Sequence, residues 1–136
     1  MLNVIEYLEA AAREKPDKTA FADDKKELTF GQLLSDSRRI GTAIAGIVGG
    51  CNRPVPVLAE RSADTISAFM GIVSSGNYYV PLDSRMPQKR LERILEQINP
   101  PFIVAQQENE KKAAELSPFC RTVMLDKLKE VPEDAA

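Results

Sequence analysis

The feature that most constrains this chain is a regular alternation of strand-like and helix-like segments through its second half. Short apolar runs alternate with longer segments whose apolar residues recur at helical spacing. Each crossover is long enough for a right-handed βαβ connection, which predicts an α/β fold: a mostly parallel sheet with flanking helices. The predicted strands are Pro54–Glu60, Tyr78–Leu82, Phe102–Ala105 and Thr122–Leu125, and the predicted helices are Ala63–Ser75, one that begins at Pro87, Glu108–Leu116 and a last turn over Lys127–Glu130.

The first half of the chain predicts two helices separated by a short N-terminal β-hairpin. Thr29-Phe-Gly-Gln32 is a capping box, in which the threonine hydroxyl and the glutamine side chain satisfy each other's backbone N–H groups at the start of a helix. Gly49-Gly50 ends that helix. The other predicted elements are a helix over Asn3–Glu14 capped by Asn3, and hairpin strands Thr19–Asp23 and Lys26–Thr29.

The stretch SSGNYYVPLD, residues 74–83, is interpreted as a structural corner. Ser62 is expected to cap the helix that precedes it, with Asp64 at the positive end of that helix. Gly76 is expected to stop the helix in a left-handed conformation. Tyr78 and Tyr79 have the ring faces to stack on a base, but at the start of a buried strand we expect them to pack.

Composition excludes several classes of function. The formal net charge is −2 with both signs interspersed, so no basic stripe for nucleic acid is present. No apolar run is long enough to span a bilayer, and Glu6 and Glu9 interrupt any signal-peptide pattern. Cys51 and Cys120 are expected to be free thiols of a cytoplasmic protein. The sequence has no histidine, which removes Ser-His-Asp and Cys-His catalysis and the commonest zinc ligand.

Polar residues near the ends of the predicted strands are weak site candidates. Glu60-Arg61, Asp83 and Asp126 lie where ligands of open α/β sheets usually bind. Polar residues are expected at strand ends in any case, so none receives a catalytic role. Gly46–Gly50 is not a phosphate loop, because its glycines follow a helix and precede a strand.

A phosphoryl-accepting receiver domain is a minor alternative. Such a domain places an acid pair after its first strand and an acceptor aspartate after its third. Asp23-Asp24 and Asp83, with Pro87 downstream and Lys127 as a doubtful counterpart of the receiver lysine, fit superficially. The strand that follows Asp24, in place of a helix, speaks against it.

Four blocks of the chain resemble adenylate-forming ligases over about residues 4–125. YLEAAAREKPDKTAFADD and LTFGQLLSDSRRIGTAI resemble the opening helix, hairpin and second helix of that family. ERSADTISAFMGIVSSGNYYVPLD resembles its RSxxxxxxxLGxLKAGxAYVPLD block, and PQKRLERILEQINPPFIVA its next segment. Within that family, the blocks most resemble the adenylation domains of nonribosomal peptide synthetases and the D-alanine–carrier-protein ligases. Ser74-Ser75 and Asn77-Tyr78 depart from the usual Lys-Ala and Gly/Ala-Ala, changes that look tolerable.

The resemblance implies a parent enzyme that activates an amino acid or other carboxylic acid with ATP and Mg²⁺, then transfers the acyl group to the phosphopantetheine thiol of a carrier protein. The family's phosphate loop, ribose-binding acid, hinge and catalytic lysine have no counterpart in these residues. We therefore expect an incomplete N-terminal subdomain over residues 1–130 with a tail over 131–136, inactive alone and prone to self-association. No catalytic, cofactor-binding or metal residue is assigned. A short non-catalytic assembly module of the same fold is the main alternative.

Overall fold

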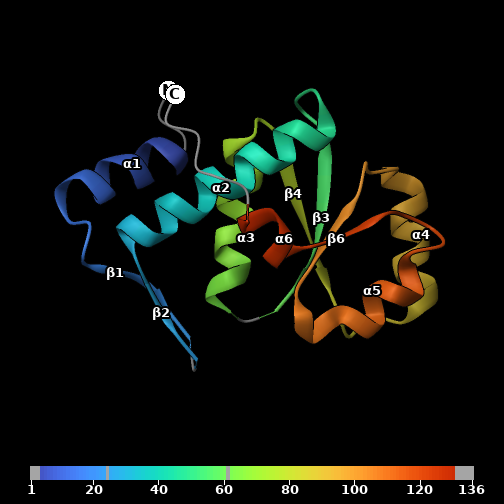
Figure 1. The fold of residues 1–136 in the computed structure, drawn as a ribbon. Coiled ribbons are helices and arrows are strands. Elements are labelled where there is room, and N and C mark those ends of the chain that lie inside the picture. The colour runs from blue at the N-terminus through green and yellow to red at the C-terminus, as the bar shows by residue number, and fades with distance from the viewer. Residues whose placement is uncertain (1–3, 24, 61, 131–136) are drawn as a thin grey trace.

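The computed structural model describes residues 4–23, 25–60 and 62–130 (Figure 1). The predicted Asn3 cap, Asp24, Arg61 and the tail of residues 131–136 lie outside the described residues. The N-terminal elements agree with the prediction to within a residue or two. They are α1 (Val4–Glu14), the strands β1 (Thr19–Ala22) and β2 (Glu27–Thr29), which pair antiparallel as a hairpin, and α2 (Phe30–Val48).

The rest of the chain forms the predicted α/β unit. The strand–helix order is the predicted one, with the last helical segments shifted slightly: a short 3₁₀ turn, η1, precedes α5, and α6 begins directly after β6. The bounds are β3 (Pro54–Ala59), α3 (Ala63–Ser74), β4 (Tyr78–Asp83), α4 (Gln88–Ile98), β5 (Ile103–Ala105), η1 (Gln107–Asn109), α5 (Glu110–Leu116), β6 (Thr122–Met124) and α6 (Leu125–Lys129).

The four strands β4-β3-β5-β6 form one sheet in that order, and all neighbours are parallel. β3 is central and pairs along its full length with β4, from Pro54 opposite Tyr78 to Ala59 opposite Asp83. Its other neighbour is β5, through Val57 and Val104. The chain therefore reverses its direction of growth across the sheet after β4, which is the switch seen in open α/β folds.

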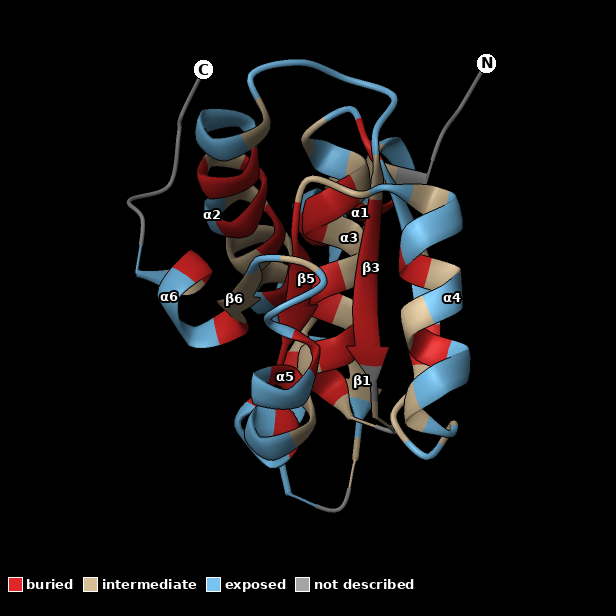
Figure 2. Ribbon diagram, turned by 90° about the vertical axis from the view of Figure 1, so that its right-hand side faces the viewer, coloured by how far each residue is buried: buried red, intermediate tan, exposed pale blue. Residues whose placement is uncertain are grey.

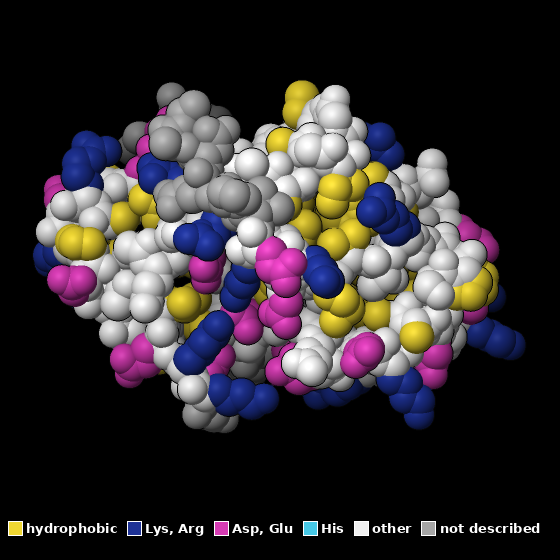
Figure 3. All heavy atoms as spheres, in the orientation of Figure 1, with side chains coloured by type: hydrophobic (Ala, Val, Ile, Leu, Met, Phe, Trp, Pro, Cys, Tyr) yellow, Lys and Arg dark blue, Asp and Glu magenta, His cyan; other side chains and the backbone are white. Residues whose placement is uncertain are grey.

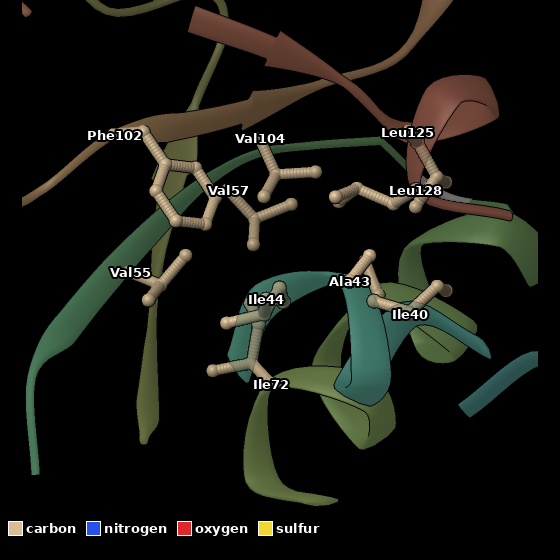
Figure 4. Packing of buried hydrophobic residues seen from close by; sticks show 11 residues of the cluster. Ile40, Ala43, Ile44, Val55, Val57, Ile72, Phe102, Val104, Leu125 and Leu128 are labelled. Atoms are coloured by element: carbon tan, nitrogen blue, oxygen red, sulfur yellow. The ribbon is translucent and has the colours of Figure 1, made fainter. Parts of the chain in front are cut away.

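Helices cover both faces of the sheet, and each face has its own apolar cluster (Figure 2). One face packs α2, α3 and α6 against strand residues such as Val55, Val57 and Val104 (Figure 4). The other packs α4 and α5 against Leu58, Leu82 and neighbouring residues. A third cluster, which includes Leu8, joins α1 and the hairpin to α2 and α3.

Glycines let α2 and α3 lie in close contact. A Cβ placed on Gly71 of α3 would lie 2.4 Å from Ile40 Cγ2 and 2.5 Å from Ile40 Cβ in α2. Gly41 of α2 faces Ser74 in the same way, with the nearest atoms at 3.1 Å. Close packing at this density leaves no room for added atoms, so the two positions set the separation of the helices.

The predicted helix boundaries are confirmed by their caps. Thr29 Oγ1 accepts from the Gln32 N–H at 3.1 Å, and Gln32 Oε1 accepts from the Thr29 N–H at 2.9 Å, which completes the capping box. Ser62 Oγ accepts from the Thr65 N–H at 3.3 Å at the start of α3. Gly49 and Gly76 both have positive φ, 69° and 86°, where glycine avoids the strain of a side chain.

The expectation that Tyr78–Leu82 is a buried strand is wrong. β4 lies at an edge of the sheet, and Tyr78 is 52% exposed and Tyr79 37% exposed. Tyr79 still packs, because its ring stacks on Phe69 with centroids 4.1 Å apart and planes 11° apart. The prediction of packing therefore holds for Tyr79, while Tyr78 is half in solvent.

Candidate functional site

The carboxyl edge of the sheet is the natural place to look for a site, and the structure brings two of the predicted candidates close together there. Glu60 follows β3 and Asp83 ends β4 beside it. Ser84 Oγ donates to Glu60 Oε1 at 2.7 Å, which links the two strand ends. A cavity of about 660 Å³ opens here, lined by Glu60 and residues 81–86.

A buried polar network fixes the turn after β3, and sequence reasoning missed it. Gln106 is only 5% exposed and follows β5 directly. Its Nε2 donates to Thr65 Oγ1 at 2.6 Å, and its Oε1 accepts from Ser62 Oγ at 3.0 Å. Thr65 Oγ1 also accepts from the Glu60 N–H at 3.2 Å. A polar residue directly after the apolar run FIVA was the one available signal, since a buried amide needs partners.

Asp83 is neutralised locally rather than presented to a ligand. Arg85 Nε and Nη2 donate to its two carboxylate oxygens at 3.1 and 3.2 Å, and the Arg85 N–H donates at 2.9 Å. The hydrogen bonds from the Arg85 side chain and backbone hold the pKa of Asp83 below its usual value. The side chains are exposed, so this pair contributes little to stability.

Asp23 has a structural role that its sequence position did not reveal. Its Oδ2 accepts from the Ala63 N–H at 2.6 Å, and its Oδ1 accepts from the N–H groups of Lys25 and Lys26 at 2.6 and 2.8 Å. These hydrogen bonds, the one from Ala63 first, lower the pKa of Asp23. The carboxylate thus closes its own hairpin turn and docks the hairpin on the first turn of α3.

The receiver-like alternative is wrong on topology. Asp23 follows β1, which lies in the antiparallel hairpin outside the parallel sheet. Asp83 ends one edge strand, whereas Lys127 is an exposed residue of α6, after the opposite edge strand. Three strand spacings, about 14 Å, separate those edges. The structure therefore does not bring together the acids and lysine that phosphoryl acceptance needs.

An ionic cluster joins the hairpin, α2, α3 and α6. Asp64 pairs with Lys26 and, at 2.6 Å, with Lys129, and Lys129 also lies 3.8 Å from Asp36. Burial opposes ionisation of Asp64, but the hydrogen bonds from Lys129 and Lys26 outweigh it and lower the pKa of the carboxyl. The partners are half-buried and mutually satisfied, so the cluster ties four elements together.

The remaining candidates do not assemble into a site. Asp126 is exposed on α6, away from Glu60 and Asp83. Gly49 ends α2 and precedes β3, as the sequence predicted for a helix stop. Cys51 is exposed and Cys120 half-buried; both are free thiols, and burial raises the pKa of Cys120.

Three observations on the described residues argue against a site for a nucleoside triphosphate or its metal ion. The N-terminus of α3 would be the best phosphate cradle, but the Asp23 carboxylate already accepts from the Ala63 N–H and the Ser62 hydroxyl from the Thr65 N–H. Glu60 and Asp83 line the cavity of about 660 Å³ beside Arg85, and Glu60, Glu108 and Glu115 line a second cavity beside Lys111 and Lys112. Carboxylates outnumber cations in both cavities, which disfavours phosphate. Within residues 4–23, 25–60 and 62–130, no group of three acidic, cysteine or histidine ligands is placed to hold a metal.

Comparison with known proteins finds one family model and relatives among ligases and synthetases. The profile of the AMP-binding enzyme family matches residues 8–136. The D-alanine–D-alanyl carrier protein ligase of Bacillus cytotoxicus is 30% identical over 133 residues, 96% of this chain and 25% of that ligase. Tyrocidine synthase 3 of Brevibacillus parabrevis is 29% identical over 101 residues, 74% of this chain and 2% of that protein. The chain therefore spans a quarter or less of the length of these curated relatives.

Solved structures show the same fold. The alpha-methyl-L-serine-AMP bound form of a nonribosomal peptide synthetase matches with a TM-score of 0.89 and 25% identity, covering 98% of this chain and 15% of that one. A benzoate CoA ligase from Burkholderia xenovorans matches with a TM-score of 0.88 at 16% identity, over 100% of this chain and 30% of that one. No helix in the described part of the chain is long and apolar enough to cross a membrane.

Proposed function

Because this chain belongs to the AMP-binding enzyme family, we propose that it is the N-terminal scaffold portion of an ATP-dependent ligase that activates an amino acid or another carboxylic acid. In the proposed reaction a carboxylate oxygen attacks the α-phosphorus of ATP, pyrophosphate leaves, and an acyl-adenylate forms. The observation that carries the proposal is the family match over residues 8–136, supported by the 30% identity to a D-alanine–carrier-protein ligase.

The second half-reaction is proposed from the same relatives. The acyl group would pass from the adenylate to the phosphopantetheine thiol of a carrier protein, with release of AMP. The sequence relatives support a carrier-linked route, since they are peptide synthetases and D-alanyl carrier protein ligases. ATP and Mg²⁺ would be held by parts of the ligase other than the described residues, since the Ala63 and Thr65 N–H groups at the start of α3 are already bonded to Asp23 and Ser62.

In this proposal the described residues have a structural role: they fix the turn after β3 and the position of the hairpin on α3. The network of Gln106, Ser62 and Thr65 fixes the turn after the central strand, and Asp23 fixes the hairpin on α3. Activation by adenylation depends on positioned donors around the phosphates, so a portion without such donors is expected to contribute geometry rather than chemistry. We expect the 136-residue chain alone to be inactive.

The test compares the 136-residue chain with the longest native product of its reading frame. Both are assayed for ATP–pyrophosphate exchange with a panel of amino acids and aryl or aliphatic acids, and for ATP binding by calorimetry. We expect exchange with at least one acid for a native product of several hundred residues, and neither exchange nor tight ATP binding for the 136-residue chain. Saturable ATP binding by that chain at micromolar levels would contradict the scaffold role.

A second candidate is a short, non-catalytic assembly module of the same fold. At the N-terminus of α3, Asp23 and Ser62 already accept from the Ala63 and Thr65 N–H groups. This observation favours the assembly module and the scaffold role equally, because neither requires a nucleotide at that position. The length of the native product separates the two. A native product of 136 residues would support the assembly module and remove the ligase proposal.

A further inference from the structure

Two lysines from distant parts of the chain bond the same oxygen atom. Lys26 lies in the turn of the hairpin, and Lys129 ends α6. Both ammonium groups donate to Oδ1 of Asp64 in the first turn of α3, Lys129 at 2.6 Å. Figure 3 shows Lys and Arg side chains interleaved with Asp and Glu side chains in the region where Figure 1 places the hairpin, α3 and α6. One carboxylate oxygen is therefore the common anchor of two elements.

The other carboxylates nearby do not relieve this sharing. Asp36 Oδ2 of α2 lies 3.8 Å from Lys129 Nζ, which is beyond hydrogen-bonding distance. Asp23 lies in the same hairpin turn as Lys26, but its carboxylate already accepts from three backbone N–H groups. Asp64 is thus the carboxylate on which both ammonium groups converge.

The two ammonium groups repel each other across the oxygen that they share. Hydrogen-bond distances of about 3 Å place their nitrogens no more than about 6 Å apart. That separation is shorter than the distance of about 8 Å over which physiological salt screens charges. The side chains of Lys26, Asp64 and Lys129 are 39%, 30% and 20% exposed, so water screens them only in part. Each lysine therefore weakens the bond of the other to Asp64.

Each element also has an apolar anchor that does not depend on the shared oxygen. Leu28 of the hairpin is buried in the cluster that includes Leu8, and Leu125 and Leu128 of α6 are buried in the cluster that includes α2 and the sheet. Loss of either lysine contact would therefore loosen the hairpin turn or the last turn of α6 without detaching the element. Local openings of this kind have lower free energies than global unfolding, so they can be measured separately.

We propose that the hairpin and α6 compete for Asp64, so that loosening either element tightens the other. This negative coupling is reciprocal, because two contacts that share one group change each other's free energy equally. A ligand or chain segment that draws Lys129 away from Asp64 would tighten the hairpin turn on α3. One that lifts the hairpin turn would tighten the end of α6. The coupling is a property of the folded residues and does not depend on the proposed function.

Two backbone amides report the two ends of the coupling, through hydrogen exchange measured by NMR on the 136-residue chain. The Ala63 N–H donates to Asp23 Oδ2 at 2.6 Å, so its exchange measures how often the hairpin turn leaves α3. The Glu130 N–H donates to the Lys127 carbonyl at 3.3 Å, so its exchange measures opening of the last turn of α6. Exchange at Val57, a buried residue of β3, reports global unfolding and shows whether a variant has changed overall stability.

Lys129→Met removes the charge of Lys129 and keeps an apolar stem. Exchange at Ala63 should then slow about threefold, because Lys26 no longer shares Asp64. Lys26→Met should slow exchange at Glu130 about threefold and speed it at Ala63, by the reciprocal argument. Asp64→Asn should speed exchange at both amides, since the two cations lose their common anion and still repel each other. Faster or unchanged exchange at Ala63 in Lys129→Met would show that the two contacts support each other or are independent, and either result would overturn the proposal.

Lys127→Met is the matched control. It removes the same charge from the same helix, but Lys127 is exposed and lines a cavity with Thr122 of β6, away from Asp64. It should change exchange at Ala63 by less than about 1.5-fold, because solvent and salt screen its charge. Equal slowing in Lys127→Met and Lys129→Met would assign the effect to overall charge and refute competition for Asp64. If faster exchange at Val57 shows that Lys129→Met has lost overall stability, Lys129→Gln takes its place, with the same slowing expected at Ala63.

Discussion

Replacement of Gly71 by alanine should destabilise the protein, although alanine is the better helix former. The added Cβ would lie 2.4 Å from Ile40 Cγ2 and 2.5 Å from Ile40 Cβ, so it cannot be accepted without movement. Ile40 is fully buried, and its β-branched side chain has one strongly preferred rotamer in a helix. The strain must therefore be relieved by separating α2 from α3.

The magnitude follows from two opposed effects. Overpacking a well-packed core costs about 1–3 kcal/mol, and the absence of a flexible neighbour here favours the upper end. Alanine in place of glycine within a helix recovers about 1 kcal/mol. The expected net loss is about 2 kcal/mol in the free energy of unfolding, or a fall of about 6 °C in Tm for a domain of this size.

Urea unfolding followed by circular dichroism measures this change, and α2 offers a matched control. A Cβ on Gly46 would meet nothing within 4 Å, so Gly46→Ala should gain about 0.5–1 kcal/mol. Opposite signs for the two substitutions are the expected result. A Gly71→Ala variant as stable as the unmodified protein would refute the claim that this glycine sets the α2–α3 separation.

Three other outcomes are expected. Thr29→Ala should lose about 1 kcal/mol through loss of the capping box, whereas Thr29→Ser should retain most of it; urea midpoints check both, and equal losses would contradict the hydroxyl's role. Because the folded-state pKa of Asp23 is depressed, the contribution of its carboxylate to stability is present above about pH 4 and is lost as pH falls through the lowered folded value. Asp23→Asn should flatten this part of the profile of unfolding free energy against pH. An unchanged profile would show that the carboxylate does not stabilise the fold. Tyr79→Ala should cost about 1 kcal/mol through its stack on Phe69, while Tyr78→Ala should stay within about 0.5 kcal/mol; equal thermal shifts would contradict the asymmetry.

The helix boundaries could be predicted from sequence because their causes are local. The capping box at Thr29, the Ser62 cap and the glycine stops each depend on a few neighbouring residues, and all were confirmed. The α/β class followed from the same local patterns in succession. Such local patterns predict whether each segment is a helix or a strand, and therefore the order of the elements along the chain.

The order of the strands in the sheet could not be predicted, because the sequence of β4 does not specify which strands pair with it. YYVPL has the composition of a buried strand, yet within the described residues only β3 pairs with it, and Tyr78 is half exposed as a result. The polar contacts were missed for the same reason. Asp23 meets Ala63, and Gln106 meets Thr65, only after the hairpin and the sheet have assembled.

The central position of β3 has a consequence for the order of assembly. β3 meets β4 across one helical crossover, but its other neighbour, β5, follows only after α3, β4 and α4. During synthesis from the N-terminus, the β3–β4 pair can form while the apolar flank of Val57 still lacks Val104. Closing that flank requires a longer loop and is entropically slower. A nascent chain therefore passes through an interval in which two of these strands are paired while the β5 side of the central strand β3 is still uncovered, and aggregation with another nascent chain is favoured during that interval.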